Sequence, residues 1–170
     1  MEHLNVEIKA LCPDPDFVRS VLRELSSDFK GVDHQVDTYF NCSNGRLKLR
    51  EGNIERALIH YQRSNTNGPK RSDVTMYPME RSSELKEVLI RSLGVLVIVD
   101  KKREIHFVKN VKIHVDEVEG LGSFVEIEAI ADETTNTEES LRKQCEMFME
   151  RLGVQSEHLI DRSYSDLLIR

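Results

Sequence analysis

Two short segments near opposite ends of the chain alternate charged and aliphatic side chains. The first reads Asn-Val-Glu-Ile-Lys-Ala from Asn5, and the second reads Val-Glu-Ile-Glu-Ala from Val125. Successive side chains of a strand point to opposite faces, so Glu126 and Glu128 would share one face, with aliphatic residues on the other. Carboxylate oxygens suit hard divalent cations such as Mg²⁺ and Mn²⁺. These carboxylates and Glu7 can act together only if the sheet brings the first strand and a late strand to a common polar space.

Basic side chains occupy the polar faces of several other predicted strands. They are Arg46, Lys48, Arg50, Arg63, Lys101, Arg103 and Lys112. If these faces line the interior of a closed sheet, their charges need partners, because burying an isolated ion costs much free energy. A triphosphate would neutralise the lysines and arginines, and a divalent cation would neutralise the carboxylates. A closed sheet of about eight strands has room for one small ligand.

A second interpretation of the same pattern needs no ligand. In an ordinary sheet the charged face lies in solvent, and ion pairs across strands each contribute roughly 0.2 to 1 kcal/mol. Composition alone favours this interpretation, which leads to a structural or adaptor protein with surface charges. The two interpretations differ in whether the basic side chains point into one enclosed space.

Hydrophobic periodicity predicts the elements that position these residues. Alternating segments predict strands at 5–10, 32–41, 45–51, 54–64, 71–79, 95–107, 111–118 and 125–129. Apolar residues at helical spacing predict helices from about Asp16 to Ser27, from Ser83 to Leu93 and from Thr137 to about Leu152. The short tail from Ser163 to Leu168 either closes one end of the sheet or only caps a helix.

Length and composition limit the class of protein. The 170 residues, 39% of them hydrophobic and 32% charged, predict one soluble domain over residues 1–170. The net charge of −6 argues against nucleic acid as a partner, because general binding to it requires clustered lysine and arginine. Three widely spaced cysteines without a Cys-x-x-Cys motif favour a reducing, cytoplasmic location. We expect neither a membrane span nor a signal peptide, since no segment has the required apolar run.

Six motifs, taken in chain order, resemble one known family. They are Asn5-Val-Glu-Ile-Lys9, Asp37-Thr-Tyr-Phe40, Gly45-Arg-Leu-Lys-Leu-Arg-Glu51, Tyr61-Gln-Arg63, Val99-Asp-Lys-Lys-Arg103 and His114-Val-Asp-Glu-Val-Glu-Gly-Leu-Gly-Ser-Phe-Val-Glu-Ile-Glu128. Together they resemble the CYTH, or triphosphate tunnel metalloenzyme, superfamily, and within it the class IV adenylyl cyclase branch. The resemblance runs from the first strand to Glu128 and extends to Tyr164, and the last motif is the most specific.

The resemblance implies an α+β fold, namely a closed eight-stranded antiparallel β-barrel, the triphosphate tunnel, with helices packed outside. It implies that basic residues bind the phosphates, at Lys9, Lys48, Arg50, Arg63, Lys101 and Arg103. It implies that acidic residues bind Mg²⁺ or Mn²⁺, at Glu7, Glu126 and Glu128. Further candidates are Asn5, Lys112, His114 and Asp116. His114 is either a general base or, as is commoner for histidine on a polar strand face, a hydrogen-bonding partner.

One position departs from the family signature. The signature is Glu-x-Glu-x-Lys, and Asn5 stands at its first glutamate. An amide oxygen can still coordinate a metal ion or orient a water molecule, but the site loses one negative charge. We therefore expect the metal to bind mainly as a complex with the triphosphate.

The resemblance leaves three functions open. The leading one is a metal-dependent enzyme that converts ATP to cyclic AMP and pyrophosphate. The second is a phosphohydrolase acting on tripolyphosphate, a nucleoside triphosphate or thiamine triphosphate. The third is a non-catalytic polyphosphate- or nucleotide-binding protein with a weakened metal site. All three predict ATP or inorganic tripolyphosphate as the partner and allow a homodimer, and none predicts a nucleic acid or a membrane.

Arg103 carries a separate expectation about stability. In an empty tunnel its guanidinium would be repelled by basic neighbours. Arg103→Ala should then weaken triphosphate binding and leave the fold nearly as stable, or more so.

Overall fold

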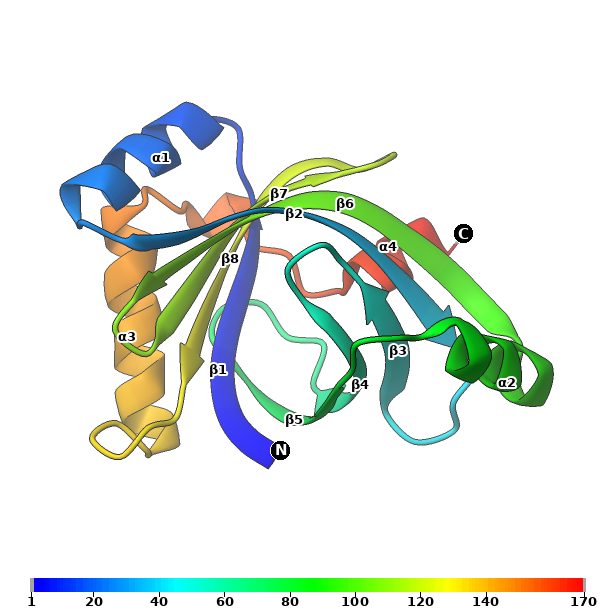
Figure 1. Cartoon of the computed structure of the whole chain (residues 1–170). Helices are drawn as coiled ribbons and strands as arrows, with labels where there is room; N and C mark the ends of the chain where they lie inside the picture. Colours follow the sequence, from blue (N-terminus) through cyan, green and yellow to red (C-terminus); the bar gives the residue numbers. More distant parts are fainter. Residues whose placement is uncertain (1, 170) are drawn as a thin grey trace.

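The computed structural model describes residues 2–169 and contains eight antiparallel strands that form a closed barrel. The strands are β1 (Glu2–Leu11), β2 (Asp28–Phe40), β3 (Arg46–Glu51), β4 (Arg56–Arg63), β5 (Lys70–Pro78), β6 (Val95–Val108), β7 (Val111–Val118) and β8 (Gly122–Ile130). The helices are α1 (Pro15–Glu24), α2 (Ser83–Leu93), α3 (Glu138–Arg151) and α4 (Tyr164–Leu168). Around the barrel the strands follow the order β1-β5-β4-β3-β2-β6-β7-β8 (Figure 1). This confirms the α+β fold and the closed eight-stranded barrel predicted from the sequence.

The first strand closes the barrel by pairing with a strand on each side. β1 is antiparallel to β8, where Glu7 lies opposite Glu128 and Lys9 lies opposite Glu126. On its other edge β1 pairs with β5, where Glu7 lies opposite Lys70. The barrel thus brings the two charged segments at opposite ends of the chain together, as predicted.

The main hydrophobic core lies outside the barrel wall. The outer faces of β1, β7 and β8 present aliphatic residues such as Ile8, Ile113 and Ile127, each at most 1% exposed. Helices α1 and α3 lie against the outside of these strands (Figure 1). Their Leu22 and Leu141 pack on the aliphatic faces, so the polar faces of the same strands turn into the barrel. The alternative of a charged face in solvent is therefore wrong for these strands.

A smaller apolar cluster fills one end of the barrel. Tyr39, Tyr61 and Phe124 point inward there, and Tyr164 of α4 packs against the ring of Phe124 at a centroid distance of 5.0 Å. Helix α4 begins with a capping box, in which the hydroxyl of Ser163 accepts from a backbone N–H in the first turn. The C-terminal tail, whose structure the sequence left open, therefore closes this end of the barrel.

Several elements differ from the sequence-based prediction, and β1 and β8 begin at Glu2 and Gly122, each three residues before its predicted start. Strand β2 begins at Asp28, before the predicted start, and a register shift beside Gly31 accommodates the extra residues. Strand β4 begins at Arg56, so that Glu55 lies in the preceding turn. Helix α2 forms as predicted, but none of its residues is buried, and Val88 is 58% exposed. None of the described helices is long and apolar enough to cross a membrane.

Candidate functional site

A cavity of about 430 Å³ lies inside the barrel. All the residues predicted to bind phosphate or metal line it: Lys9, Lys48, Arg50, Arg63, Lys101, Arg103, Glu7, Glu126 and Glu128. Lys112 and His114, two of the further candidates, line it as well. The other two, Asn5 and Asp116, are buried and contact residues that line it. These basic side chains therefore point into one space, whereas Arg46 does not line it and pairs with Asp166 at 2.7 Å.

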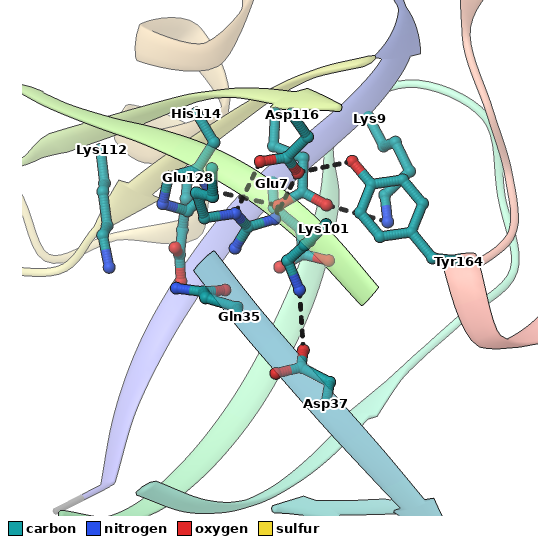
Figure 2. A network of polar contacts seen from close by, with 12 residues as sticks. Glu7, Lys9, Gln35, Asp37, Lys101, Lys112, His114, Asp116, Glu128 and Tyr164 are labelled. Atoms are coloured by element: carbon teal, nitrogen blue, oxygen red, sulfur yellow. Dashed lines mark hydrogen bonds and ion pairs between the residues drawn. The ribbon is translucent and has the colours of Figure 1, made fainter. Parts of the chain in front are cut away.

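Asp37 on β2 holds three of the lysines and arginines. Its carboxylate accepts from Lys48 Nζ at 3.0 Å, from Arg50 Nη2 at 2.9 Å and from Lys101 Nζ at 2.8 Å. Figure 2 shows Lys101 pointing toward Asp37. Burial would raise the pKa of Asp37, but these cations hold it well below its usual range. Arg50 also pairs with Glu55 at 3.1 Å, yet the basic side chains here outnumber the carboxylates, and the excess positive charge faces the cavity.

The same crowding affects the protonation of Lys101. Burial, together with the charges of Arg103 and Arg50, lowers the pKa of Lys101 to about 7, although Asp37 acts in the opposite direction. An anion placed beside this ammonium group would favour its charged form. Lys101 therefore responds to the charge of whatever enters the cavity.

Arg103 on β6 is held by two carboxylates. Its Nε and Nη2 donate to Asp116 at 2.7 and 2.5 Å, and Nη2 also donates to Glu126 at 2.8 Å. Asp116 in turn accepts from the Tyr164 hydroxyl at 2.7 Å, as Figure 2 shows. Arg103 is only 3% exposed. The premise that basic neighbours leave it under net repulsion is therefore wrong, because these carboxylates surround its guanidinium.

The three predicted metal ligands are engaged with other side chains. Glu7 pairs with Arg63, and Glu126 pairs with Lys9 Nζ at 2.9 Å. Among residues 2–169 no three histidine, cysteine or acidic side chains form a group ready to hold a metal ion. The carboxylates must therefore exchange partners before they could bind a cation together.

Glu128 nevertheless lies in surroundings that suit a cation. Burial and the nearby charges of Glu7 and Glu126 raise the pKa of Glu128 to about 7, against the opposing effect of Lys112. Asn5 donates its amide N–H to Glu128, while Asn5 Oδ1 is buried without a hydrogen-bond partner in the described part of the chain. Glu128 and the amide oxygen of Asn5 thus lack a cationic partner among the described residues. This donor set fits a hard divalent ion.

His114 is unsuited to carry a proton at neutral pH. Burial and the charge of Arg103 lower its pKa to about 3, even though Glu126 favours the charged form. Its Nδ1 lies 3.3 Å from Glu126 Oε2. The structure therefore favours a hydrogen-bonding role for His114.

The sequence-based prediction missed Glu55, which also lines the cavity. Glu55 pairs with Lys112 and, at 3.1 Å, with Arg50 Nη1. The buried carboxylate of Asp33 fixes the turn by accepting from the backbone N–H groups of Ile54 at 2.8 Å and Glu55 at 3.0 Å. The Gly-Asn turn was visible in the sequence, but periodicity placed Glu55 in the following strand.

Comparisons with known proteins agree with this geometry. The model of the CYTH domain family matches residues 3–164. The chain is 27% identical over 180 residues to the Methanocaldococcus jannaschii protein named "Putative adenylate cyclase MJ0240", covering 96% of this chain and 98% of that protein.

Two solved structures show the same fold. A Pyrococcus horikoshii protein superposes with a TM-score of 0.82 at 22% identity, covering 98% of this chain and 99% of that one. The Hippeastrum protein HpAC1, described with a dominant triphosphatase activity, has a TM-score of 0.61 at 16% identity and covers 96% of this chain and 93% of its own.

Proposed function

Because the chain belongs to the CYTH domain family, we propose that it is a metal-dependent enzyme that converts ATP to cyclic AMP and pyrophosphate in the barrel cavity. One observation carries the proposal: the wall of a single cavity combines lysines, arginines and carboxylates. A complex of a divalent cation with a triphosphate carries the opposite charges. The full-length similarity to the M. jannaschii protein supports the choice of reaction.

The group around Asp37 would bind the phosphates. Lys48, Arg50 and Lys101 share this one carboxylate, so they can interact with phosphate oxygens while remaining partly neutralised. Arg63, on the neighbouring strand β4, is held only by Glu7 among its described ion pairs. Arginine and lysine here supply donors in fixed directions, which is how proteins orient a phosphate chain.

Phosphate binding would also release the metal ligands. A triphosphate that attracts Lys9 and Arg63 leaves Glu7 without its ion-pair partner and leaves Glu126 with Arg103. Together with Glu128, these side chains would then hold Mg²⁺ or Mn²⁺. Once bound, such an ion withdraws electron density from the phosphate oxygens and helps pyrophosphate to leave.

In the proposed reaction the ribose 3′-hydroxyl transfers its proton to water and its oxygen forms a bond to the α-phosphorus. The bond between the α-phosphorus and the bridging oxygen breaks, and pyrophosphate leaves. The protein contributes position and charge and forms no covalent intermediate. The low pKa of His114 agrees with a role in positioning rather than proton transfer.

Hydrolysis of a triphosphate is the second candidate. The same cations and carboxylates would stabilise attack by water on the terminal phosphate, which gives inorganic phosphate. HpAC1, which shares the fold, supports this candidate through its described triphosphatase activity.

Product analysis separates these reactions. The protein is incubated with ATP and Mn²⁺, and cyclic AMP, pyrophosphate, ADP and inorganic phosphate are quantified. We expect cyclic AMP and pyrophosphate in equal amounts, and we expect Glu126→Gln to abolish them. Glu117→Gln, on an exposed position of β7, is the matched control and should leave the rate unchanged. ADP with phosphate would favour hydrolysis, and the absence of any product would contradict catalysis.

A further inference from the structure

One part of the cavity wall carries no charge. On adjacent strands β4 and β5, the side chains of Ile59, Val74 and Met76 line the cavity, and we call these three residues the aliphatic wall. Ile59 lies opposite Met76 in the register, and Val74 lies opposite Tyr61. Charged residues of the cavity come mainly from the other strands. The cavity therefore has a polar part and an apolar part.

The aliphatic wall adjoins the phosphate-binding residues. Across the β3–β4 pair, Ile59 lies directly opposite Lys48. A ligand whose phosphates contact Lys48 and Lys101 would therefore have its next part beside Ile59. The aliphatic wall is therefore adjacent to Lys48, one of the basic residues that contact Asp37.

The polar part and the apolar part of the cavity favour different chemical groups of a ligand. Inorganic tripolyphosphate has the same three phosphates as a nucleoside triphosphate, so it would occupy the cationic part of the cavity and leave no group to lie against the aliphatic wall. An organic ring in the same place would lose little on leaving water and would gain free energy by burying apolar surface. The cavity volume of about 430 Å³ lies within the range of small-molecule sites that combine apolar walls with a few polar groups.

We propose that the aliphatic wall binds the ring system of a nucleoside triphosphate, so that the protein selects this class over inorganic tripolyphosphate. The inference rests on the proposed function, because the phosphates must occupy the cationic part. Packing of the barrel interior alone does not account for the wall. Val99 belongs to the same apolar cluster and is 1% exposed, yet it does not line the cavity, whereas Val74 does.

Calorimetric titration with Mn²⁺ present tests the selection. The probes are α,β-methylene-ATP, which cannot release pyrophosphate, and inorganic tripolyphosphate. The wild-type protein should bind the nucleotide analogue at least about tenfold more tightly. Val74→Ala should weaken binding of the analogue by about fivefold and leave tripolyphosphate binding unchanged. Val99→Ala removes the same atoms away from the cavity and should alter neither affinity.

The other outcomes distinguish failure of the inference from failure of the proposed function. Equal or tighter binding of tripolyphosphate by the wild-type protein would overturn the inference and leave the proposed function standing. Equal weakening of both probes in Val74→Ala, with an unchanged melting temperature, would do the same. If Val74→Ala does not fold, the affinities for the two probes are compared in Ile59→Ala instead. The ratio of the two affinities in the wild-type protein also tests the inference. Failure of both probes to bind the wild-type protein would overturn the proposed function, and the inference with it.

Discussion

Asn5 has an amide where the family signature has a carboxylate. The contacts of this amide indicate how asparagine at this position affects the protein. Asn5 is fully buried and donates to Glu128, whose pKa is already raised by burial and by neighbouring carboxylates. A carboxylate in place of the amide would add repulsion in the free protein. The amide therefore stabilises the metal-free state of this protein.

Asn5→Asp tests this interpretation. The variant should unfold at a lower temperature than the wild type without metal, because two carboxylates then meet in a buried place. Its affinity for Mn²⁺ should be higher, since one more charged oxygen faces the ion. Thermal unfolding and calorimetric titration of Mn²⁺ measure the two effects. An unchanged Mn²⁺ affinity would place residue 5 outside the set of metal ligands.

Lys101 makes binding of a triphosphate depend on pH. In the free protein the pKa of Lys101 is lowered to about 7, and a bound anion should raise it. Binding then takes up a proton above pH 7, so affinity is greatest below that pH and falls as the pH increases through it. Titration at pH 8 in buffers of different ionisation enthalpy measures the proton uptake. Lys101→Met should reduce that uptake, and an unaltered value would assign it to another group.

Arg103→Ala should now destabilise the protein, contrary to the expectation from sequence. The substitution leaves Asp116 and Glu126 without the guanidinium that both contact. Removing one partner of a buried ion pair costs about 3 kcal/mol. Urea unfolding measures the change, with Arg71→Ala, an exposed arginine of β5, as the control. Equal stability of Arg103→Ala and the wild type would contradict this reading of the contacts.

The sequence identified which side chains enter the cavity but not which of them contact each other. Alternation decides the face on which Lys48 or Arg103 lies, and it needs only the local pattern. The contacts of Asp37 and Tyr164 depend on strand register and on the path of the chain terminus, which no local pattern encodes. The structure therefore places Lys48 and Arg103 on the cavity side, and the contacts of Arg103 with Asp116 and Glu126 reverse the expected effect of Arg103→Ala on stability.

Helix α4 is short, yet it places one side chain in contact with charged residues of the site. This five-residue helix places Tyr164 against Lys9, whose ammonium lies 3.5 Å from the ring centroid, and against Asp116. Tyr164 thus contacts a basic residue, Lys9, and an acidic residue, Asp116.

Tyr164→Phe isolates the hydroxyl of this contact. The variant keeps the ring but removes the donor to Asp116, so the free energy of unfolding should fall by about 1 kcal/mol. Tyr77→Phe, at a side chain that is 68% exposed, should be neutral. Chemical unfolding compares the two variants. If Tyr164→Phe and the wild type have the same free energy of unfolding, the Tyr164 hydroxyl does not stabilise the packing of α4.

Most helices and strands were predictable because their patterns are long and regular. The strands β7 and β8 alternate cleanly, and Thr137 marks the start of α3 through its capping box. The start of β2 was not predictable, because Asp28 to Gly31 offer no alternating pattern. The apolar residues of α2 predicted the helix correctly, but they did not predict its exposure, which depends on what the fold places beside it.

At the scale of the whole molecule, the charged interior couples ligand binding to stability. Excess positive charge around Asp37 is a cost that a triphosphate removes, so the folded protein should be stabilised by its ligand. At a nucleotide concentration 100 times the dissociation constant, the free energy of unfolding should rise by about 2.7 kcal/mol. Unfolding measured with and without α,β-methylene-ATP and Mn²⁺ tests this. An unchanged midpoint would mean that the cavity does not bind this ligand.

The closure of the barrel also determines when the protein can fold during its synthesis. Strand β1 is made first, yet its partner β8 is among the last strands to leave the ribosome, and the hydrogen bond from Asn5 to Glu128 joins residues 123 positions apart. Until then the nascent chain exposes unpaired strand edges, which favour aggregation. Contacts this distant in sequence also make folding slow. The protein should therefore depend on chaperones while it is being made, and far less once the last strand is in place.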